Sequence, residues 1–213
     1  MRSPWLDIPL ADYEGHMALP SVGQGDLLAT QFDELLTSLL PESAAVIGCA
    51  GGNGFDRVRI AITKRLVGID INPHYIQELA YRHAATIPGL ELYVRDIQEP
   101  LAGIRPVQFI YAALVMEYVE PAAALGNLVA LCGPETILAT VLQLPGSHAP
   151  PVTESPFIRL QELAPVLRLV PPEKLAACAS EQGFVLLATR YLTAASGKQF
   201  ALQLFRRSAP PRT

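Results

Sequence analysis

A glycine-rich turn between two apolar runs contains the residues of this chain best suited to hold a ligand. Four of the seven residues from Gly48 to Gly54 are glycines. Glycine accepts a positive φ and lets a ligand approach the backbone closely. The second apolar run, residues 66–69, ends at Asp70, about 20 residues on, where a carboxylate can accept both hydroxyls of a ribose. The pattern predicts a nucleoside-bearing ligand, held where a helix follows the turn and offers free N–H groups.

Two further segments hold side chains that can do chemistry. Residues 11–17 include Tyr13 and His16, and histidine can act as a base near neutral pH. The alternative for this segment is a surface turn that orders the N-terminal tail. Glu117 follows a long apolar run and can bind an amine or a hydroxyl, or simply begin a solvated helix. His148 lies in a proline-rich loop, where it either contacts a bound substrate or faces solvent.

The elements that must position these residues alternate along most of the chain. Apolar runs predict strands over residues 44–49, 65–70, 90–94, 107–115, 136–144, 184–192 and 199–205. Helical spacing and capping residues predict helices over residues 24–40, 53–64, 72–86, 121–132 and 171–183, with residues 1–22 irregular. Helical crossovers favour parallel strands, while the short link before the last strand favours a hairpin. The sequence therefore predicts an α/β fold with a doubly wound, seven-stranded sheet, mostly parallel with an antiparallel C-terminal hairpin.

Composition narrows the class of protein. Half of the 213 residues are hydrophobic, the charged fraction is 17%, and the net charge is −4, which argues against binding a nucleic-acid backbone. Three cysteines at irregular spacing, and histidines without partners at ligand spacing, predict free thiols and no metal site. No apolar run is long enough for a membrane span, and the start of the chain lacks the apolar stretch of a signal peptide. We expect a cytoplasmic monomer or homodimer.

With these elements in this order, the chain resembles the class I S-adenosylmethionine-dependent methyltransferases over residues 42–206. The similar features are the glycine turn at 46–54, the strand end at 67–72, the acidic turn at 95–97 and the closing hairpin. The resemblance implies a Rossmann-like fold over 42–207, a lid segment and helix over 1–41 and a disordered tail over 208–213. It also implies S-adenosylmethionine as cofactor and methyl transfer to an oxygen or nitrogen of a small molecule.

The resemblance assigns roles to individual residues. Backbone groups of Gly48, Cys49, Ala50 and Gly52 are expected to line the methionine portion of the cofactor. Asp70 is expected to accept from both ribose hydroxyls, with Ile71 packed on the adenine.

On the adenine side, Asp96 is expected to accept from the amino group, with Ile97 on the other face of the ring. Ala112 to Leu114 are expected to border the methyl-transfer site. Tyr13 and His16 are expected to close over it, with His16 as a base, and Glu117 to contact the acceptor.

Two positions depart from the family pattern. The family often has an acid where Val46 stands and usually has glycine where Ala50 stands. A methyl group at position 50 fits if the local φ is negative, so a positive φ there counts against this assignment. Two other functions remain open: a nicotinamide-dependent oxidoreductase, which needs a similar glycine turn, and a non-catalytic nucleoside-binding protein of the same fold.

Overall fold

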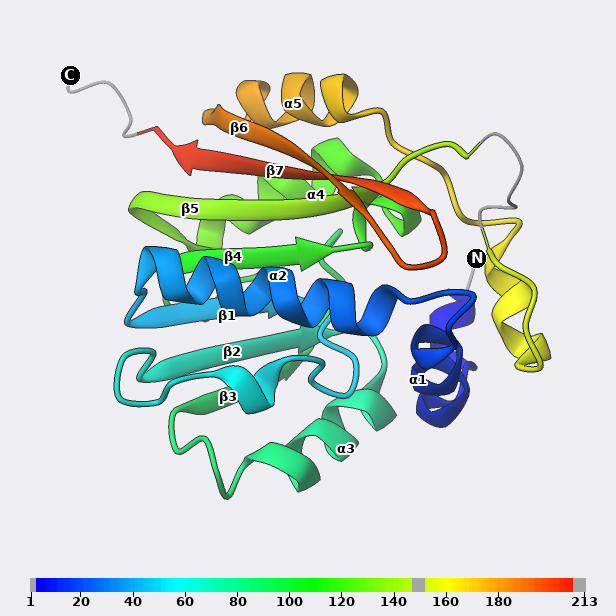
Figure 1. Cartoon of the computed structure of the whole chain (residues 1–213). Coiled ribbons are helices and arrows are strands. Elements are labelled where there is room, and N and C mark those ends of the chain that lie inside the picture. Colours follow the sequence, from blue (N-terminus) through cyan, green and yellow to red (C-terminus); the bar gives the residue numbers. More distant parts are fainter. Residues whose placement is uncertain (1–2, 147–151, 209–213) are drawn as a thin grey trace.

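Seven strands form one sheet with helices on both of its faces (Figure 1). The computed structural model describes residues 3–146 and 152–208. The strand order is β3-β2-β1-β4-β5-β7-β6, in which β1 to β5 are parallel and β7 is antiparallel to both neighbours. The strands are β1 (Ser43–Ile47), β2 (Arg65–Asp70), β3 (Leu90–Val94), β4 (Val107–Ala113), β5 (Cys132–Gln143), β6 (Phe184–Thr193) and β7 (Gln199–Arg207). The predicted fold class is confirmed.

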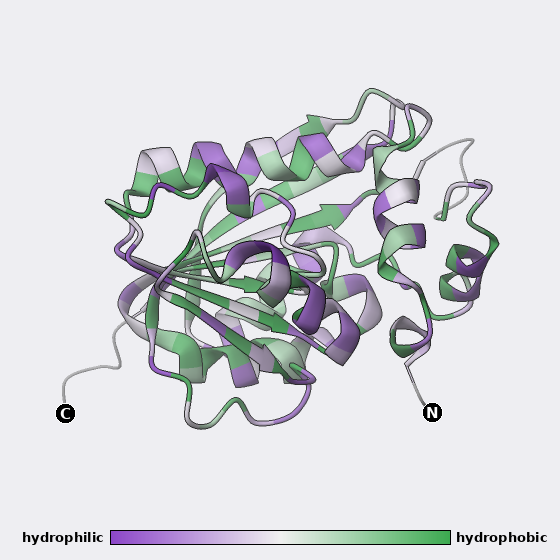
Figure 2. Cartoon of the chain, turned by 90° about the horizontal axis from the view of Figure 1, so that it is seen from below, coloured by the Kyte–Doolittle hydropathy of each residue, from purple (hydrophilic) through white to green (hydrophobic). Residues whose placement is uncertain are grey.

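Helices cover both faces of the sheet, and each face has its own hydrophobic core. The α-helices are α1 (Leu10–Ala18), α2 (Gln24–Leu39), α3 (Pro73–His83), α4 (Pro121–Leu128) and α5 (Pro172–Glu181). Short 3₁₀ helices are η1 (Pro4–Leu6), η2 (Phe55–Arg57), η3 (Met116–Tyr118), η4 (Val129–Leu131) and η5 (Ile158–Leu163). One core packs α2 and α3 against the sheet, and the other packs α4 and α5 against the opposite face. Figure 2 shows the hydrophobic strands between helices of mixed character.

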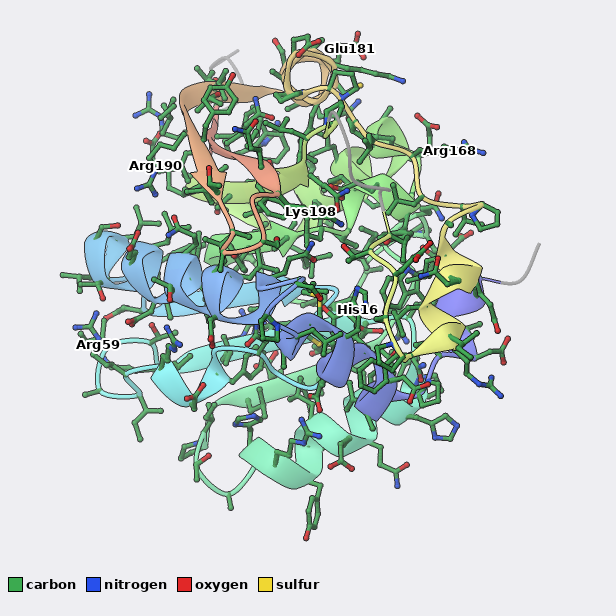
Figure 3. All side chains as sticks on the ribbon, turned by 45° about the vertical axis from the view of Figure 1, so that its right-hand side comes forward. His16, Arg59, Arg168, Glu181, Arg190 and Lys198 are labelled. Atoms are coloured by element: carbon green, nitrogen blue, oxygen red, sulfur yellow. The ribbon has the colours of Figure 1, made fainter. Side chains whose placement is uncertain are left out.

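The connection from β1 to β2 corrects one prediction, because residues 53–64 are not a helix. Only the single 3₁₀ turn η2 forms there, and it starts after Gly54, which has a φ of +83°. Side chains tie the loop to α2 instead: Arg57 donates to Thr30 Oγ1 at 3.1 Å, and Arg59 donates to Thr37 Oγ1 at 2.8 Å. Figure 3 labels Arg59 on this loop beside α2. The turn is therefore not followed by the long helix whose first N–H groups were expected to face a ligand.

The N-terminal region corrects a second prediction, because residues 1–22 are not irregular throughout. Residues 10–18 form α1, and the prolines that suggested disruption lie outside it, with Pro9 at the position that precedes its first turn. Proline is tolerated there because the first N–H groups of a helix have no intrahelical partner. Figure 1 shows α1 and the segment with η5 at the edge toward which the parallel strands point. Among the described residues, no helix has the length and apolar character needed to cross a bilayer.

Candidate functional site

A cavity of about 690 Å³ opens at the carboxyl ends of the parallel strands. This volume lies within the range of pockets for small ligands and cofactors, about 300–1,000 Å³. Its floor comes from the segments that follow β1, β2, β3 and β4, and includes Gly48, Asp70, Asp96 and Leu114. The position agrees with the rule that ligands of open α/β sheets bind beyond the carboxyl ends of the strands.

Asp70 is one of the buried acids of this cavity, with 8% of its surface exposed. Its Oδ2 accepts from the Ala50 N–H and its Oδ1 accepts from the Asn72 N–H, both at 2.9 Å. Burial raises the pKa of Asp70, and backbone hydrogen bonds from Asn72, Ala50 and Ile71 oppose this rise. Each carboxylate oxygen has two acceptor sites, so Asp70 can hold the glycine turn and still accept from a ligand.

The glycine turn combines one required glycine with one strained alanine. Gly48 has a φ of +65°, and a Cβ added to it would lie 3.3 Å from Val115 Cγ2, so both backbone and space favour glycine. Ala50 has a φ of +45° and Leu114 a φ of +55°, although side chains rarely occur in this region. The positive φ at Ala50 counts against the sequence-based assignment of this residue to the methionine portion. Backbone strain of this kind clusters at functional sites.

Six of the nine predicted cofactor residues line the cavity, namely Gly48, Ala50, Asp70, Ile71, Asp96 and Ile97. The structure does not bring the other three to it. Cys49 is buried with its Sγ toward Gly68, and Gly52 lies against His83. Ala112 is fully buried between β1 and β5, so Ala113 and Leu114 line the cavity in its place.

An N-terminal strap, residues 3–19, lies against this cavity and is held by α3. The Asn72 side chain donates to the Trp5 carbonyl at 2.8 Å, and the Tyr75 hydroxyl donates to the Ile8 carbonyl at 3.0 Å. Arg82 also forms an ion pair with Glu14 of the strap. Ser3, Pro4 and Trp5 also line the cavity, although the sequence pattern did not predict them as site residues. The one tryptophan of the chain, next to a proline, was the signal available for them.

Three aromatic rings border the cavity where the strap crosses it. Trp5 makes edge-to-face contacts with Tyr13 and Tyr118, at centroid distances of 5.6 Å and 5.0 Å. Burial, with Asp70 and Glu14 nearby, raises the pKa of Tyr13, and burial with Glu117 nearby raises that of Tyr118. Both phenols are therefore neutral at physiological pH and can donate hydrogen bonds.

A second, smaller cavity of about 50 Å³ shares five lining residues with the first, namely Trp5, Tyr13, Leu114, Glu117 and Tyr118. Its other lining residues include His16, Gln24, Gln143 and Lys198 beside apolar side chains of the segment with η5. His16 is buried, its Nδ1 lies 2.9 Å from Ser155 Oγ, and burial together with the Lys198 charge lowers its pKa. The structure thus brings the three predicted catalytic residues, Tyr13, His16 and Glu117, to the lining of one cavity. Figure 3 labels His16 and Lys198, two residues of this lining.

Glu117 lies on η3 with 2% of its surface exposed. Its Oε1 accepts from the Gln143 N–H at 2.7 Å, and burial raises its pKa to about 7. The alternative of a solvated helix start is therefore wrong. Across residues 3–146 and 152–208, no group of three or more His, Cys, Asp or Glu is placed to hold a metal ion. His148 and residues 209–213 of the expected tail lie outside the described residues.

Comparisons with known proteins identify the fold. No protein-family profile matches the sequence, and no curated protein sequence matches it. Among solved structures, the N-methyltransferase NodS from Bradyrhizobium japonicum WM9 with S-adenosyl-L-homocysteine has a TM-score of 0.65 and 17% identity. The similarity covers 87% of this chain and 88% of NodS.

Two other solved structures show how varied the proteins of this fold are. Magnesium protoporphyrin IX methyltransferase from Synechocystis PCC 6803 with bound SAM has a TM-score of 0.61 and 13% identity, covering 88% of this chain and 81% of that one. The [4+2]-cyclase SpnF has a TM-score of 0.65 and 13% identity, and the similarity covers 84% of this chain and 82% of SpnF. At these identities the likeness concerns the fold, and this chain has the Rossmann-like fold of the S-adenosylmethionine-dependent methyltransferases.

Proposed function

We propose that this protein is an enzyme that transfers a methyl group from S-adenosylmethionine to an oxygen or nitrogen of a small molecule. One observation carries the proposal: the cavity gathers Gly48, Asp70 and Asp96 from the ends of three neighbouring parallel strands. A required glycine and two acids so placed suit a ligand with a ribose and an adenine. The NodS and protoporphyrin methyltransferase structures hold S-adenosyl-L-homocysteine and SAM on the same fold, which supports this choice.

The residues present fit this cofactor. Asp70 has acceptor sites left for ribose hydroxyls. Asp96 accepts from the Gln98 N–H through Oδ1, which leaves Oδ2 for an amino group. Trp5 and Tyr13 line the cavity and suit a positively charged sulfonium, because aromatic rings attract cations. When bound, S-adenosylmethionine supplies an electrophilic methyl group.

The chain's own contribution is to position the reactants and exclude water. The strap and Tyr118 lie beside the segment that follows β4, where the acceptor must meet the methyl group. Holding two reactants in line can supply several kcal/mol of the barrier reduction. His16 and Glu117 are candidate bases for an acceptor that starts protonated.

Calorimetric titration with S-adenosyl-L-homocysteine tests the proposal. We expect micromolar binding to the wild type and at least tenfold weaker binding to Asp70→Asn, which keeps the shape of the side chain but loses its charge. The matched control is Asp56→Asn, an exposed acid on η2 outside the cavity, and it should bind like the wild type. A folded wild type that binds NADH and not S-adenosyl-L-homocysteine would instead support the oxidoreductase alternative.

The turn itself favours a second candidate, a non-catalytic nucleoside-binding protein. Ala50 is strained and Val46 replaces an acid that the family often has. The cyclase SpnF also shows that proteins of this fold need not be methyltransferases by name. Tight S-adenosyl-L-homocysteine binding with no methyl transfer to any tested acceptor would favour this candidate.

We further propose that the protein acts in the cytoplasm as a monomer or homodimer, without nucleic-acid or membrane partners. The net charge of −4, from 16 basic and 20 acidic residues, supports the lack of a nucleic-acid partner. In this proposal residues 1–41 serve as lid segment and helix, 42–207 as the cofactor-binding domain and 208–213 as a tail.

A further inference from the structure

Glu117 holds an unsatisfied acceptor at the junction of the two cavities. Oε1 accepts from the Gln143 N–H, but Oε2 is buried and has no hydrogen-bond partner among the residues that the structure describes. No ion pair to Glu117 is found among those residues either. A buried carboxylate oxygen without a partner is costly, and native structures satisfy nearly all such groups. The vacant position on Oε2 therefore calls for a donor from outside the described part of the chain.

The surroundings of Glu117 define what can bring that donor. Glu117 lines both the large cavity, with Asp70 and Asp96, and the small one. The small cavity has an apolar wall from the segment with η5, made of Val152, Leu160, Leu163 and Leu167. Trp5, Tyr13 and Tyr118 stand between the two spaces. A molecule that reaches Glu117 is thus surrounded by apolar and aromatic groups, with its donor at one end.

We propose that the methyl acceptor is an apolar molecule with an amine or hydroxyl group, which donates to Oε2 of Glu117 and gives its proton to that oxygen. This inference rests on the proposed methyl transfer. The N–H or O–H bond breaks and its proton goes to Oε2. The electron pair left on nitrogen or oxygen forms the new bond to the methyl carbon. The carbon–sulfur bond breaks with its electron pair left on sulfur, as a neutral thioether, and the proton then leaves Glu117 to solvent.

The position of Glu117 suits this role better than that of His16. His16 Nδ1 is engaged with Ser155 Oγ, and His16 lines only the small cavity. Glu117, in contrast, lines both cavities. A base must lie within hydrogen-bond reach of the proton that it removes. The raised pKa of Glu117, caused by burial, supports proton exchange near neutral pH. In this scheme His16 is a positioning residue of the cavity wall.

Probe binding to the protein saturated with S-adenosyl-L-homocysteine tests the inference without any turnover. The probes are benzylamine, phenol, cyclohexylamine and cyclohexanol, with toluene and methylcyclohexane as donor-free counterparts, and NMR titration gives each Kd. At least one donor-bearing probe should bind the wild type about tenfold or more tightly than its counterpart. Preference for the amines indicates a nitrogen acceptor, and preference for phenol or cyclohexanol an oxygen acceptor.

Glu117→Gln should abolish this preference. Its amide oxygen stays on the Gln143 N–H, so the NH₂ group replaces Oε2 and faces the donor of the probe. Glu181→Gln is the matched control, because Glu181 is exposed on α5, apart from His16 in Figure 3, and should keep the preference. Donor-free probes that bind as tightly as the others, or a preference that survives in Glu117→Gln, would overturn the inference.

A pH series on the wild type covers the case in which Glu117→Gln does not fold. Amine binding should strengthen about tenfold from pH 6 to pH 8, as Glu117 goes from mostly protonated to mostly ionised. The other titratable or charged groups that line the two cavities with it are Tyr13, His16, Asp70, Tyr75, Arg95, Asp96, Tyr118, Glu120, Arg168 and Lys198. Amine binding that stays constant over this range would count against the role of Glu117.

The two proposals fail in different ways. If the wild type does not bind S-adenosyl-L-homocysteine, the proposed function fails and the role of Glu117 falls with it. If that binding is intact but no probe shows a donor preference, only the role of Glu117 is rejected.

Discussion

Ala50 holds a left-handed backbone, φ +45°, in the turn that faces the large cavity. Its N–H donates to Asp70, so the conformation is fixed by the same acid that we assign to the ribose. For residues other than glycine the left-handed region costs about 1–2 kcal/mol. The protein therefore retains a strained residue at the site, although a glycine at position 50 would remove the strain.

Substitutions at Ala50 and Gly48 should therefore change the stability of the protein in opposite directions. Ala50→Gly relieves the strain but makes the unfolded chain more flexible, so we expect a net stabilisation below about 1 kcal/mol. Gly48→Ala should destabilise by more than Gly103→Ala, because both have a positive φ but only Gly48 also has Val115 in the way. Urea unfolding measures all three. A large loss of stability in Ala50→Gly would show that the methyl group packs usefully.

Glu117 should give the stability of the protein a particular dependence on pH. Its pKa is raised from 4.5 to about 7, so the folded state favours the protonated form. Stability from this group is complete below about pH 4.5 and is lost as pH rises through about 7, by about 3 kcal/mol in all. The free energy of unfolding of Glu117→Gln should therefore increase relative to that of the wild type as pH rises over this interval. Glu181→Gln should run parallel to the wild type, and a parallel course for Glu117→Gln would contradict the burial effect.

At the scale of elements, α3 acts as the support of the N-terminal strap. Asn72 caps α3 by accepting from the His74 N–H and also donates to the Trp5 carbonyl. Tyr75 and Arg82 lie one and about three turns further along and contact Ile8 and Glu14. The same helix thus fixes both the strap and the end of β2 that carries Asp70.

Loss of one contact between α3 and the strap should loosen the strap. Tyr75→Phe removes the hydrogen bond to Ile8, which we expect to cost about 1 kcal/mol. Amide hydrogen exchange in residues 5–18 should rise, and S-adenosyl-L-homocysteine should bind several-fold more weakly. Tyr81→Phe on the same helix is the control, because Tyr81 is 86% exposed. Equal ligand affinity in the two variants would show that the strap does not contribute to binding.

The elements also show what the sequence can predict. The strand at 90–94 and the end of β2 at Asp70 agree with prediction, because apolar runs ending at a polar residue are local signals. The crossover at 53–64 does not, since Arg57 and Arg59 find partners on α2 that no local pattern reveals. The small cavity could not be predicted from the sequence either, because packing joins side chains about 80 to 180 residues apart, such as His16, Glu117 and Lys198.

On the scale of the whole molecule, the large cavity connects the strap, four strand ends and residues 165–168. A ligand there should therefore stabilise the fold as a unit. At a concentration one hundred times its Kd, S-adenosyl-L-homocysteine adds about 2.7 kcal/mol. For a chain of this length, that raises the Tm by about 5–10 °C. Differential scanning fluorimetry should show the full shift in the wild type and Asp56→Asn and at most about half of it in Asp70→Asn, whose Kd is at least tenfold higher. A shift with NADH alone would reject the assignment.

The packing of α2 also bears on how the chain folds while it is being made. Phe32 stacks on Phe109 and contacts the tilted ring of Tyr111, whose hydroxyl donates to the Leu28 carbonyl. One side of α2 is thus covered by a strand made some 80 residues later. At ordinary synthesis rates that delay is on the order of ten seconds. During this interval α2 can pack only against earlier segments, such as Phe55 and β1, and the part of its apolar side that β4 covers has no native partner. That part of α2 should therefore stay exposed until β4 has left the ribosome.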